Sequence, residues 1–292
     1  MAKNRLTFQI SATRETHSGY SLITVDAYTE SMAVLLTSAA SAGSTGTSGY
    51  SLLIADDGAE VAAAQRLRYD VFAAELGANL PTADSGLDVD EFDEFCDHLI
   101  VREDSTGAVV GTYRMLPPQA AARAGRRYSD TEFDMTSLSP LRDHLVETGR
   151  SCVHPDHRSG AVINLMWAGI ARYLHLKNLR WLGGCASVPL ADGPKTVAGV
   201  WDLAREKHMS PPALRVRPRR PWLAQPGAAE AVAAHTGRAA VPPLLRGYLR
   251  LGAWICGEPA YDPDFAVADL YVLLSLDRVD PRYLKHFLGD SQ

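Results

Sequence analysis

The stretch from Leu145 to Leu176 constrains the fold of this 292-residue chain more than any other part of the sequence. Leu145–Val153 has the length and apolar content of a buried strand, and His154-Pro155 ends it because proline cannot continue a strand ladder. Residues 159–176 then repeat apolar side chains at helical spacing. These side chains are Leu165, Met166, Ile170, Ala171 and Leu174. A strand that turns through a short loop into a long amphipathic helix indicates an α/β domain.

Strands and helices mix irregularly along the rest of the chain. The pattern predicts a helix over residues 58–76 and further strands on both sides of the 145–176 unit. The predicted strands are Tyr50–Ala55, His98–Glu103, Val109–Leu116, Arg180–Ser187, Gly252–Gly257 and Leu270–Leu276. Because strands and helices do not alternate strictly, we expect an α/β (α+β) sheet rather than a doubly wound one.

The composition supports one folded body preceded by a separate segment. Hydrophobic residues make up 46% of the chain and charged residues 22%, which is typical of a globular protein with a sizeable core. Ser38–Ser48 is rich in Gly, Ser and Thr, as flexible linkers are. We therefore expect residues 1–48 to be a flexible or appended segment and residues 49–292 to form the domain.

Charge, hydropathy and cysteine spacing exclude several classes of protein. The formal charge of −5 and the pI of about 6.0 argue against a nucleic-acid binder. There is no apolar run of 18 residues and no convincing signal peptide. The four cysteines form no C-x-x-C pair, so reduced thiols in the cytoplasm are expected. His154 and His157 lack a third ligand nearby, so we expect no metal.

The loop between the strand and the helix has the features of a phosphate-binding turn. A helix N-terminus presents unpaired backbone N–H groups and the positive end of the helix dipole. Here the helix opens on Arg158-Ser159-Gly160-Ala161, directly after Cys152 and Val153 on the strand. This arrangement favours binding of a phosphate group, whereas an ordinary strand-to-helix turn is the alternative. It resembles the loop by which GNAT-type N-acyltransferases hold the phosphopantetheine arm of an acyl thioester.

Further motifs accompany this loop in a fixed order. They are Arg68-Tyr-Asp-Val71-Phe72, Asp88-Val-Asp90-Glu-Phe-Asp93, Gly111-Thr-Tyr-Arg114-Met-Leu-Pro117 and Glu147-x-x-Arg150. This succession resembles the acyl-homoserine-lactone synthases. A longer resemblance, from about residue 50 to 287, is to the ornithine–acyl-ACP N-acyltransferases of the GNAT superfamily, which are related to the N-acyl amino acid synthases. It includes Gly149-Arg150-Ser-Cys-Val153 and Pro242-Pro-Leu-Leu-Arg-Gly247.

The resemblance implies a fold and a reaction. The fold is a GNAT-type mixed, mostly antiparallel sheet flanked by helices, with a C-terminal elaboration. The reaction is aminolysis of an acyl thioester, with acyl carrier protein (ACP) or CoA carrying the acyl group and no permanently bound cofactor. A protonated amine needs a base, for which Glu147 is the first candidate. Asp90 is the second, because the lactone-synthase resemblance places a carboxylate there.

The remaining motif residues suggest a charged network and an oxyanion site. We expect Arg68, Asp93, Arg114 and Arg150 to order the substrate-side loop, in either a structural or a catalytic role, with Phe72 and Glu75 beside them. Backbone N–H groups beside a bulge at Cys152–Val153 would stabilise the tetrahedral oxyanion.

Two charged segments hide beneath the mild net charge. Residues 84–97 hold seven acids and no base, and we expect them to attract a cationic amino acid. Residues 205–220 hold six bases against one acid. Within them, Arg215, Arg217, Arg219 and Arg220 are candidates for docking acidic ACP or, alternatively, an anionic membrane surface, whereas a solvated loop is the plain alternative.

The sequence thus predicts an enzyme that moves a (3-hydroxy) fatty acyl group from ACP to the α-amine of an ornithine-like amino acid. The product would be a lyso-ornithine lipid or an N-acyl amino acid, made in the cytoplasm or at the inner membrane face. The alternatives are a lactone-type signal synthase, an acetyl-CoA-dependent acetyltransferase and a non-catalytic protein of the same fold.

Overall fold

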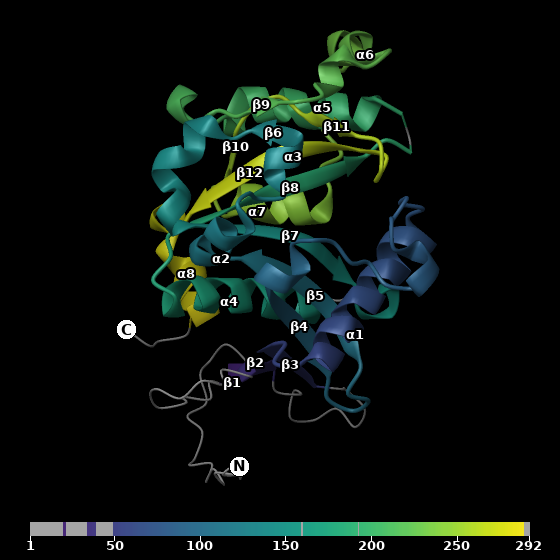
Figure 1. The fold of residues 1–292 in the computed structure, drawn as a ribbon. Coiled ribbons are helices and arrows are strands. Elements are labelled where there is room, and N and C mark those ends of the chain that lie inside the picture. Colours follow the sequence, from purple (N-terminus) through teal and green to yellow (C-terminus); the bar gives the residue numbers. More distant parts are fainter. Residues whose placement is uncertain (1–19, 22–33, 39–48, 159, 192, 289–292) are drawn as a thin grey trace, which may run out of the picture.

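The computed structural model describes residues 20–21, 34–38, 49–158, 160–191 and 193–288, and its centre is a ten-stranded sheet (Figure 1). The strand order is β1-β2-β3-β4-β5-β7-β8-β12-β10, and β11 also pairs with β12. The strands are β1 (Tyr20–Ser21), β2 (Val34–Ser38), β3 (Tyr50–Ile54), β4 (Asp97–Glu103), β5 (Val109–Leu116), β7 (Leu145–Val153), β8 (Trp181–Pro189), β10 (Trp254–Ile255), β11 (Ala260–Asp262) and β12 (Val267–Ser275). A separate pair is formed by β6 (Phe133–Asp134) and β9 (Arg217–Pro218). This mixed, mostly antiparallel sheet confirms the predicted fold class.

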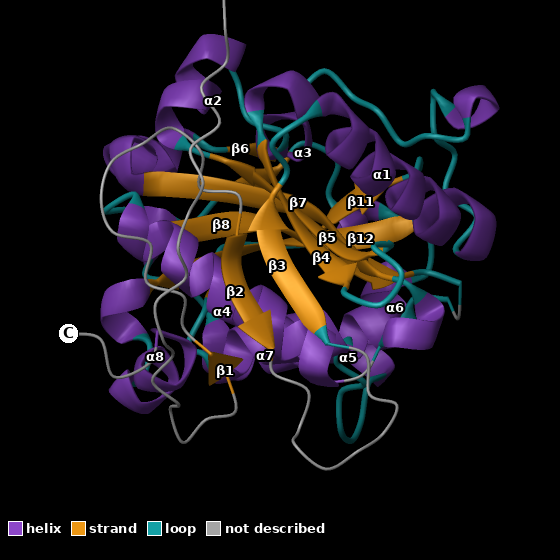
Figure 2. Ribbon diagram, turned by 90° about the horizontal axis from the view of Figure 1, so that it is seen from below, coloured by secondary structure: helices purple, strands orange, loops and turns teal. Residues whose placement is uncertain are grey.

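Helices cover both faces of the sheet (Figure 2). One face carries α1 (Gly58–Tyr69), which continues as a π-helical turn over Asp70–Glu75, and α2 (Pro118–Ala124) and α3 (Ser129–Glu132). The other face carries α4 (Gly160–Leu176), α5 (Lys195–Leu203), α7 (Pro243–Arg250) and α8 (Pro281–Leu288). The short α6 (Ala228–Ala234) packs on α5. Because side chains alternate along a strand, Leu52 joins the large core beneath α4, whereas Leu53 packs with Ala64 of α1.

The N-terminal segment contributes to the sheet where it is described. Inside residues 1–48, β2 pairs antiparallel with β3, and β1 pairs with β2. Residues 39–48 of the predicted linker lie outside the described residues. A boundary at residues 48 and 49 therefore stays a prediction. Among the described residues, none of the helices is both long and apolar enough to span a bilayer.

The parallel pair β7–β8 creates the opening in the sheet. The two strands pair at only three positions, ending at Glu147–Gly183, and each then continues with a different antiparallel partner. Gly183 and Gly184 lie at this point. A Cβ atom at Gly183 would collide with the Tyr271 hydroxyl, and one at Gly184 with the Thr148 carbonyl oxygen. The two glycines therefore let the strands approach before they separate.

Candidate functional site

A cavity of about 390 Å³ lies where β7 and β8 diverge. Its volume falls within the range of small-molecule sites. Most of its lining side chains are apolar, and two of these, Leu76 and Leu244, are exposed at its rim. The apolar wall also includes Phe72, Ala78, Phe92, Leu116, Ala186, Pro189, Ala191, Phe265, Ala266 and Val267. Most of the polar lining groups come from β5, β7, β8, β11 and β12.

An irregularity in β7 falls at Arg150 and Ser151. These two residues lie opposite the single Tyr113 of β5 and form a β-bulge. Arg150 has φ of 51°, a conformation that residues other than glycine rarely adopt. The expected bulge at Cys152–Val153 is wrong, because both residues pair regularly with β5 and Cys152 packs against α1, outside the cavity.

Glu147 lies at the last position at which β7 pairs with β8, and it lines the cavity. Its Oε2 accepts a hydrogen bond from the Tyr128 backbone N–H at 3.0 Å. Its Oε1 accepts from the Ser129 backbone N–H at 2.7 Å and from the Ser129 hydroxyl. Burial raises the pKa of Glu147, and the hydrogen bonds from Ser129 oppose that rise without cancelling it. The carboxylate is thus held in place and is more basic than an exposed one.

Arg68 is the centre of a buried ion-pair network. Its Nη1 and Nη2 bind the two oxygens of Asp93 at 2.9 and 2.8 Å, and its Nε binds Asp88 Oδ2 at 2.8 Å. Arg114 Nη1 donates to Asp93 Oδ1 at 2.9 Å. Burial by itself would raise the pKa of Asp93, but the hydrogen bonds and charges of Arg68 and Arg114 lower it well below its usual value.

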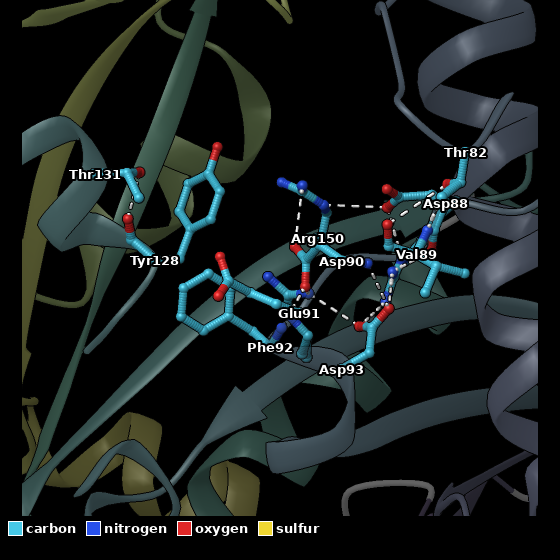
Figure 3. A network of polar contacts seen from close by, with 12 residues as sticks. Thr82, Asp88, Val89, Asp90, Glu91, Phe92, Asp93, Tyr128, Thr131 and Arg150 are labelled. Atoms are coloured by element: carbon cyan, nitrogen blue, oxygen red, sulfur yellow. Dashed lines mark hydrogen bonds and ion pairs between the residues drawn. The ribbon is translucent and has the colours of Figure 1, made fainter. Parts of the chain in front are cut away.

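Asp90 and Arg150 complete this network at the end nearest Tyr128 (Figure 3). The oxygens of Asp90 lie 2.5 Å from Arg114 Nη1 and 3.2 Å from Arg150 Nη2, and Arg150 Nε lies 3.1 Å from Asp88 Oδ2. The Arg150 guanidinium also lies over the rings of Tyr128 and Phe265, at 5.0 and 4.8 Å. Three arginines thus balance three aspartates. Both oxygens of Asp90 already face arginines.

Two residues expected beside the network lie elsewhere. Phe72 lines the cavity and meets the Phe265 ring edge-on at 5.9 Å. Glu75 is wrong as a network member, because its carboxylate forms a two-pronged pair with Arg158 at 2.7 and 2.5 Å. The hydrogen bond from Arg158 lowers the pKa of Glu75.

The predicted thioester loop is described only in part. Gly160 opens α4, and Gly160 and Ala161 are exposed. Arg158 binds Glu75, next to Leu76 at the cavity rim. Ser159 lies outside the described residues. A role for this loop in holding the acyl carrier arm therefore stays a prediction.

The acidic segment 84–97 differs from its expected role. Asp88, Asp90 and Asp93 are neutralised by the three arginines of the network, so they do not present free negative charge to an amine. The negative charge that lines the cavity comes instead from Glu147, Asp262 and Asp269.

The sequence reasoning missed Asp262 and Asp269 as site residues. Asp262 ends β11 and Asp269 lies on β12, where it accepts a hydrogen bond from the Ser187 hydroxyl at 2.7 Å. Burial raises the pKa of Asp269 to about 7, and the charge of Asp262 adds to the rise. A sequence signal existed, because Asp269 is the one charged residue of the apolar strand Val267–Ser275.

The thiols and tyrosines of the cavity are protonated at neutral pH. Burial raises the pKa of Cys96 to about 12 and that of Cys185 well above its usual value, so neither is a ready nucleophile. Burial likewise raises the pKa values of Tyr113 and Tyr248, whose hydroxyls contact each other. In the part of the chain that the structure describes, we find no group of His, Cys, Asp and Glu side chains suited to a metal.

The basic patch lies beside α3 and β6. Its four arginines, Arg215, Arg217, Arg219 and Arg220, are all exposed. Arg219 anchors the patch to α3, donating its Nε to the Asp130 carbonyl at 2.7 Å and its backbone N–H to the Glu132 carbonyl at 2.8 Å. The patch is therefore a fixed, exposed basic surface.

A family model and two relatives together define an N-acyltransferase of the GNAT class. The family model, described as an acetyltransferase (GNAT) domain, matches residues 67–168, from α1 into α4. The chain is 36% identical over 248 residues to the L-ornithine N(alpha)-acyltransferase of Rhodobacter capsulatus, covering 82% of this chain and 94% of that protein. It is 32% identical over 259 residues to the protein of the same name from Brucella abortus, covering 82% and 88%. The chain belongs to the L-ornithine N(alpha)-acyltransferase family.

Solved structures show weaker likenesses. The acyl-homoserine-lactone (AHL) synthase LasI superposes with a TM-score of 0.46 at 13% identity, covering 83% of this chain and 96% of that one. FeeM, an N-acyl amino acid synthase from uncultured soil microbes, has a TM-score of 0.43 at 11% identity, with 78% and 92% covered. These scores are too low to bear on the function.

Proposed function

We propose that this protein transfers a 3-hydroxy fatty acyl group from the phosphopantetheine thioester of ACP to the α-amine of ornithine, giving a lyso-ornithine lipid. The family relationship supports the ornithine acceptor, because the curated relatives carry that activity in their names. The observation that carries the proposal is the cavity at the β7–β8 opening, which joins an apolar wall to the buried carboxylate of Glu147.

The apolar wall favours a long acyl chain over an acetyl group. Leu76 and Leu244 extend the apolar surface from the cavity to solvent, and Leu76 is 64% exposed. Burying such a rim beneath a fatty chain is favourable at about 25 cal/mol per Å² of apolar surface. An acetyl group would leave most of this surface in water.

The chemistry that we propose centres on Glu147. Its carboxylate takes one proton from the α-ammonium and releases it to solvent, and the free amine nitrogen attacks the thioester carbonyl carbon. As the N–C bond forms, Glu147 takes the second proton from the nitrogen and passes it to the thiolate that departs when the C–S bond breaks. Backbone N–H groups beside the β7 bulge, where Thr148–Ser151 line the cavity, would stabilise the oxyanion, and Arg150 is a partner for the α-carboxylate. No covalent enzyme intermediate is needed, because a thiolate is a good leaving group.

The acyl donor and the place of action are further parts of the proposal. The exposed arginines of the basic patch favour ACP, whose surface is strongly acidic. Anionic lipid headgroups are the rival partner for the same charges. We place the protein in the cytoplasm, in contact with the inner membrane face when the product leaves.

The activity test uses the purified chain, ornithine and ACP charged with a 3-hydroxyacyl group. Mass spectrometry should detect N-acyl ornithine, with turnover that requires both substrates. Acyl-CoA serves as the comparison for the carrier, and acetyl-ACP serves as the comparison for the chain length. Absence of product with every amino acid and donor would overturn the proposed function.

Glu147→Gln tests the proposed base. We expect kcat to fall by about 10²- to 10⁴-fold, the usual contribution of a positioned base. Glu94→Gln is the matched control, because it makes the same change at an exposed glutamate. Unchanged turnover in Glu147→Gln would remove Glu147 from the mechanism.

Reversing the four patch arginines to glutamate tests ACP docking. We expect KM for the ACP-bound donor to rise at least about 10-fold, because electrostatic complementarity is lost. The free acyl-pantetheine donor should be affected much less. An equal fall in activity with both donors would exclude the patch as the ACP site. Loss of co-sedimentation with anionic vesicles in this variant would favour the membrane as the partner of the patch.

A further inference from the structure

Two buried carboxylates line the β11–β12 side of the cavity, and a third lies in the neighbouring helix α3. Asp262 and Asp269 line the cavity and are only 3% and 2% exposed. Glu132 is 6% exposed and lies in α3, which packs against β11. Burial, together with the charges of Asp262 and Asp269, raises the pKa of Glu132 to about 7, so the three carboxylates interact electrostatically.

Among the described residues this group has no ion-pair partner, although the more distant Arg220 and Arg150 oppose the rise in the pKa values of Glu132 and Asp269. Asp262 Oδ1 accepts hydrogen bonds from the backbone N–H groups of Asp264 and Phe265. Across the described ranges, no lysine or arginine lies within ion-pair distance of Glu132, Asp262 or Asp269. Glu132 Oε2 is a buried oxygen without a hydrogen-bond partner. A buried carboxylate is costly unless a positive group or hydrogen-bond donors compensate it. The structure therefore leaves room for a cation supplied from outside the chain.

The spacing within the cavity fits a molecule with two amines. Glu147 pairs with Gly183 of β8, and the Ser129 hydroxyl contacts both its carboxylate and Cys185 Sγ, so the carboxylate extends along the cavity toward Cys185. Asp269 binds Ser187, two residues further along that strand, which is about 7 Å. The two nitrogens of an extended ornithine are separated by five bonds, or about 6 Å.

We propose that Asp262, Asp269 and Glu132 form a subsite for the side-chain ammonium of the amino acid acceptor. This inference rests on the proposed function and deepens it, because it explains selection of a diamino acid over a neutral one. With the α-amine at Glu147, the side-chain ammonium reaches Asp269 and Asp262 and supplies the missing positive charge. Glu132 lies behind the pair and strengthens the negative potential.

The test compares ornithine with norvaline, which has the same carbon chain without the terminal amine. With one acyl-ACP donor, wild-type kcat/KM should favour ornithine by about 100-fold or more, because a charged hydrogen-bonded contact is lost with norvaline. In Asp269→Asn, which can still accept from Ser187, kcat/KM for ornithine should fall about 10- to 100-fold, mainly through KM. The ratio of kcat/KM for ornithine to kcat/KM for norvaline should fall as well.

Two further variants keep the test interpretable. Glu132→Gln should lower the same ratio by a smaller factor. It replaces Asp269→Asn as the test variant if Asp269→Asn does not fold. Asp264→Asn, an exposed aspartate in the turn after β11, is the matched control and should keep the wild-type ratio. A wild-type protein that acylates ornithine and norvaline equally, or an Asp269→Asn ratio equal to wild type, would overturn the subsite while the proposed function stands.

Calorimetric binding separates the subsite from catalysis. Wild-type protein should bind ornithine at least about 10-fold more tightly than norvaline, and Asp269→Asn should lose that difference. If no acylation is found but this difference in binding is present, the proposed function fails and the subsite is supported. If neither amino acid is acylated and neither binds, both are overturned.

Discussion

Two clusters of buried charge flank the cavity, and they are built in opposite ways. In the ion-pair network, Arg68, Arg114 and Arg150 balance Asp88, Asp90 and Asp93, and each charge meets an opposite one within 3.2 Å. In the acidic subsite, Glu132, Asp262 and Asp269 have no such partner among the described residues. The charges of the first cluster are balanced within the chain, whereas those of the second are balanced only when a cation binds.

The difference separates scaffolding from recognition. The network ties α1 and the 88–93 loop to β5 and β7, and so fixes one wall of the cavity. The acidic subsite costs stability in the free protein, as functional sites with shifted pKa values commonly do. The network should therefore raise the free energy of unfolding, whereas the acidic subsite should lower it.

The largest effect is expected from Arg68→Met. This change leaves Asp88 and Asp93 buried without their main partner, and should lower the free energy of unfolding by about 3–5 kcal/mol. Urea denaturation followed by circular dichroism measures the loss. Arg102→Met, which breaks a partly exposed pair with Glu60, should cost less than about 1 kcal/mol. Losses of similar size in the two variants would mean that the network does not stabilise the fold.

Asp269→Asn should act in the other direction. Removing a buried carboxylate that lacks a cation should raise the free energy of unfolding of the ligand-free protein by about 1–3 kcal/mol at pH 8. Thermal and urea denaturation without ornithine measure the change. A clear loss of stability at pH 8 would show that a partner already compensates Asp269.

The pH dependence of these two clusters has opposite signs. The pKa of Asp269 is raised from its usual value near 4 to about 7, so its unfavourable contribution is absent below pH 4 and grows as pH rises to 7. The gain from Asp269→Asn should therefore increase between pH 5 and pH 8. The pKa of Asp93 is lowered, so its favourable contribution is present above pH 4 and is lost as pH falls below that value.

The smallest effect is expected from Glu75→Gln. Its pair with Arg158 is well formed but partly exposed, at 33% and 44% of the side chains. We expect a loss of less than about 1 kcal/mol in the free energy of unfolding. A loss as large as that of Arg68→Met would place Glu75 in the network after all.

Local sequence patterns predicted the fold well where one element is strongly periodic. Val109–Leu116 and Leu145–Val153 match the observed strands residue for residue, and the helix after Pro155 ends at Leu176 as expected. The bulge was misplaced, because backbone φ at Arg150 depends on how β5 and β7 pair across the sheet. No local pattern in the strand carries that information.

The sequence by itself determined the order of the main elements, the family motifs and the choice of Glu147 as a candidate carboxylate. Those features depend on residue type and spacing within one segment. Only the tertiary structure decided which acids stay unpaired. Residues 84–97 are acidic in sequence but meet three arginines in space, whereas Asp262 on β11, Asp269 on β12 and Glu132 on α3 have no ion-pair partner among the described residues. Charge pairing acts through space, so a count of charges along the chain does not show where the molecule needs a cation.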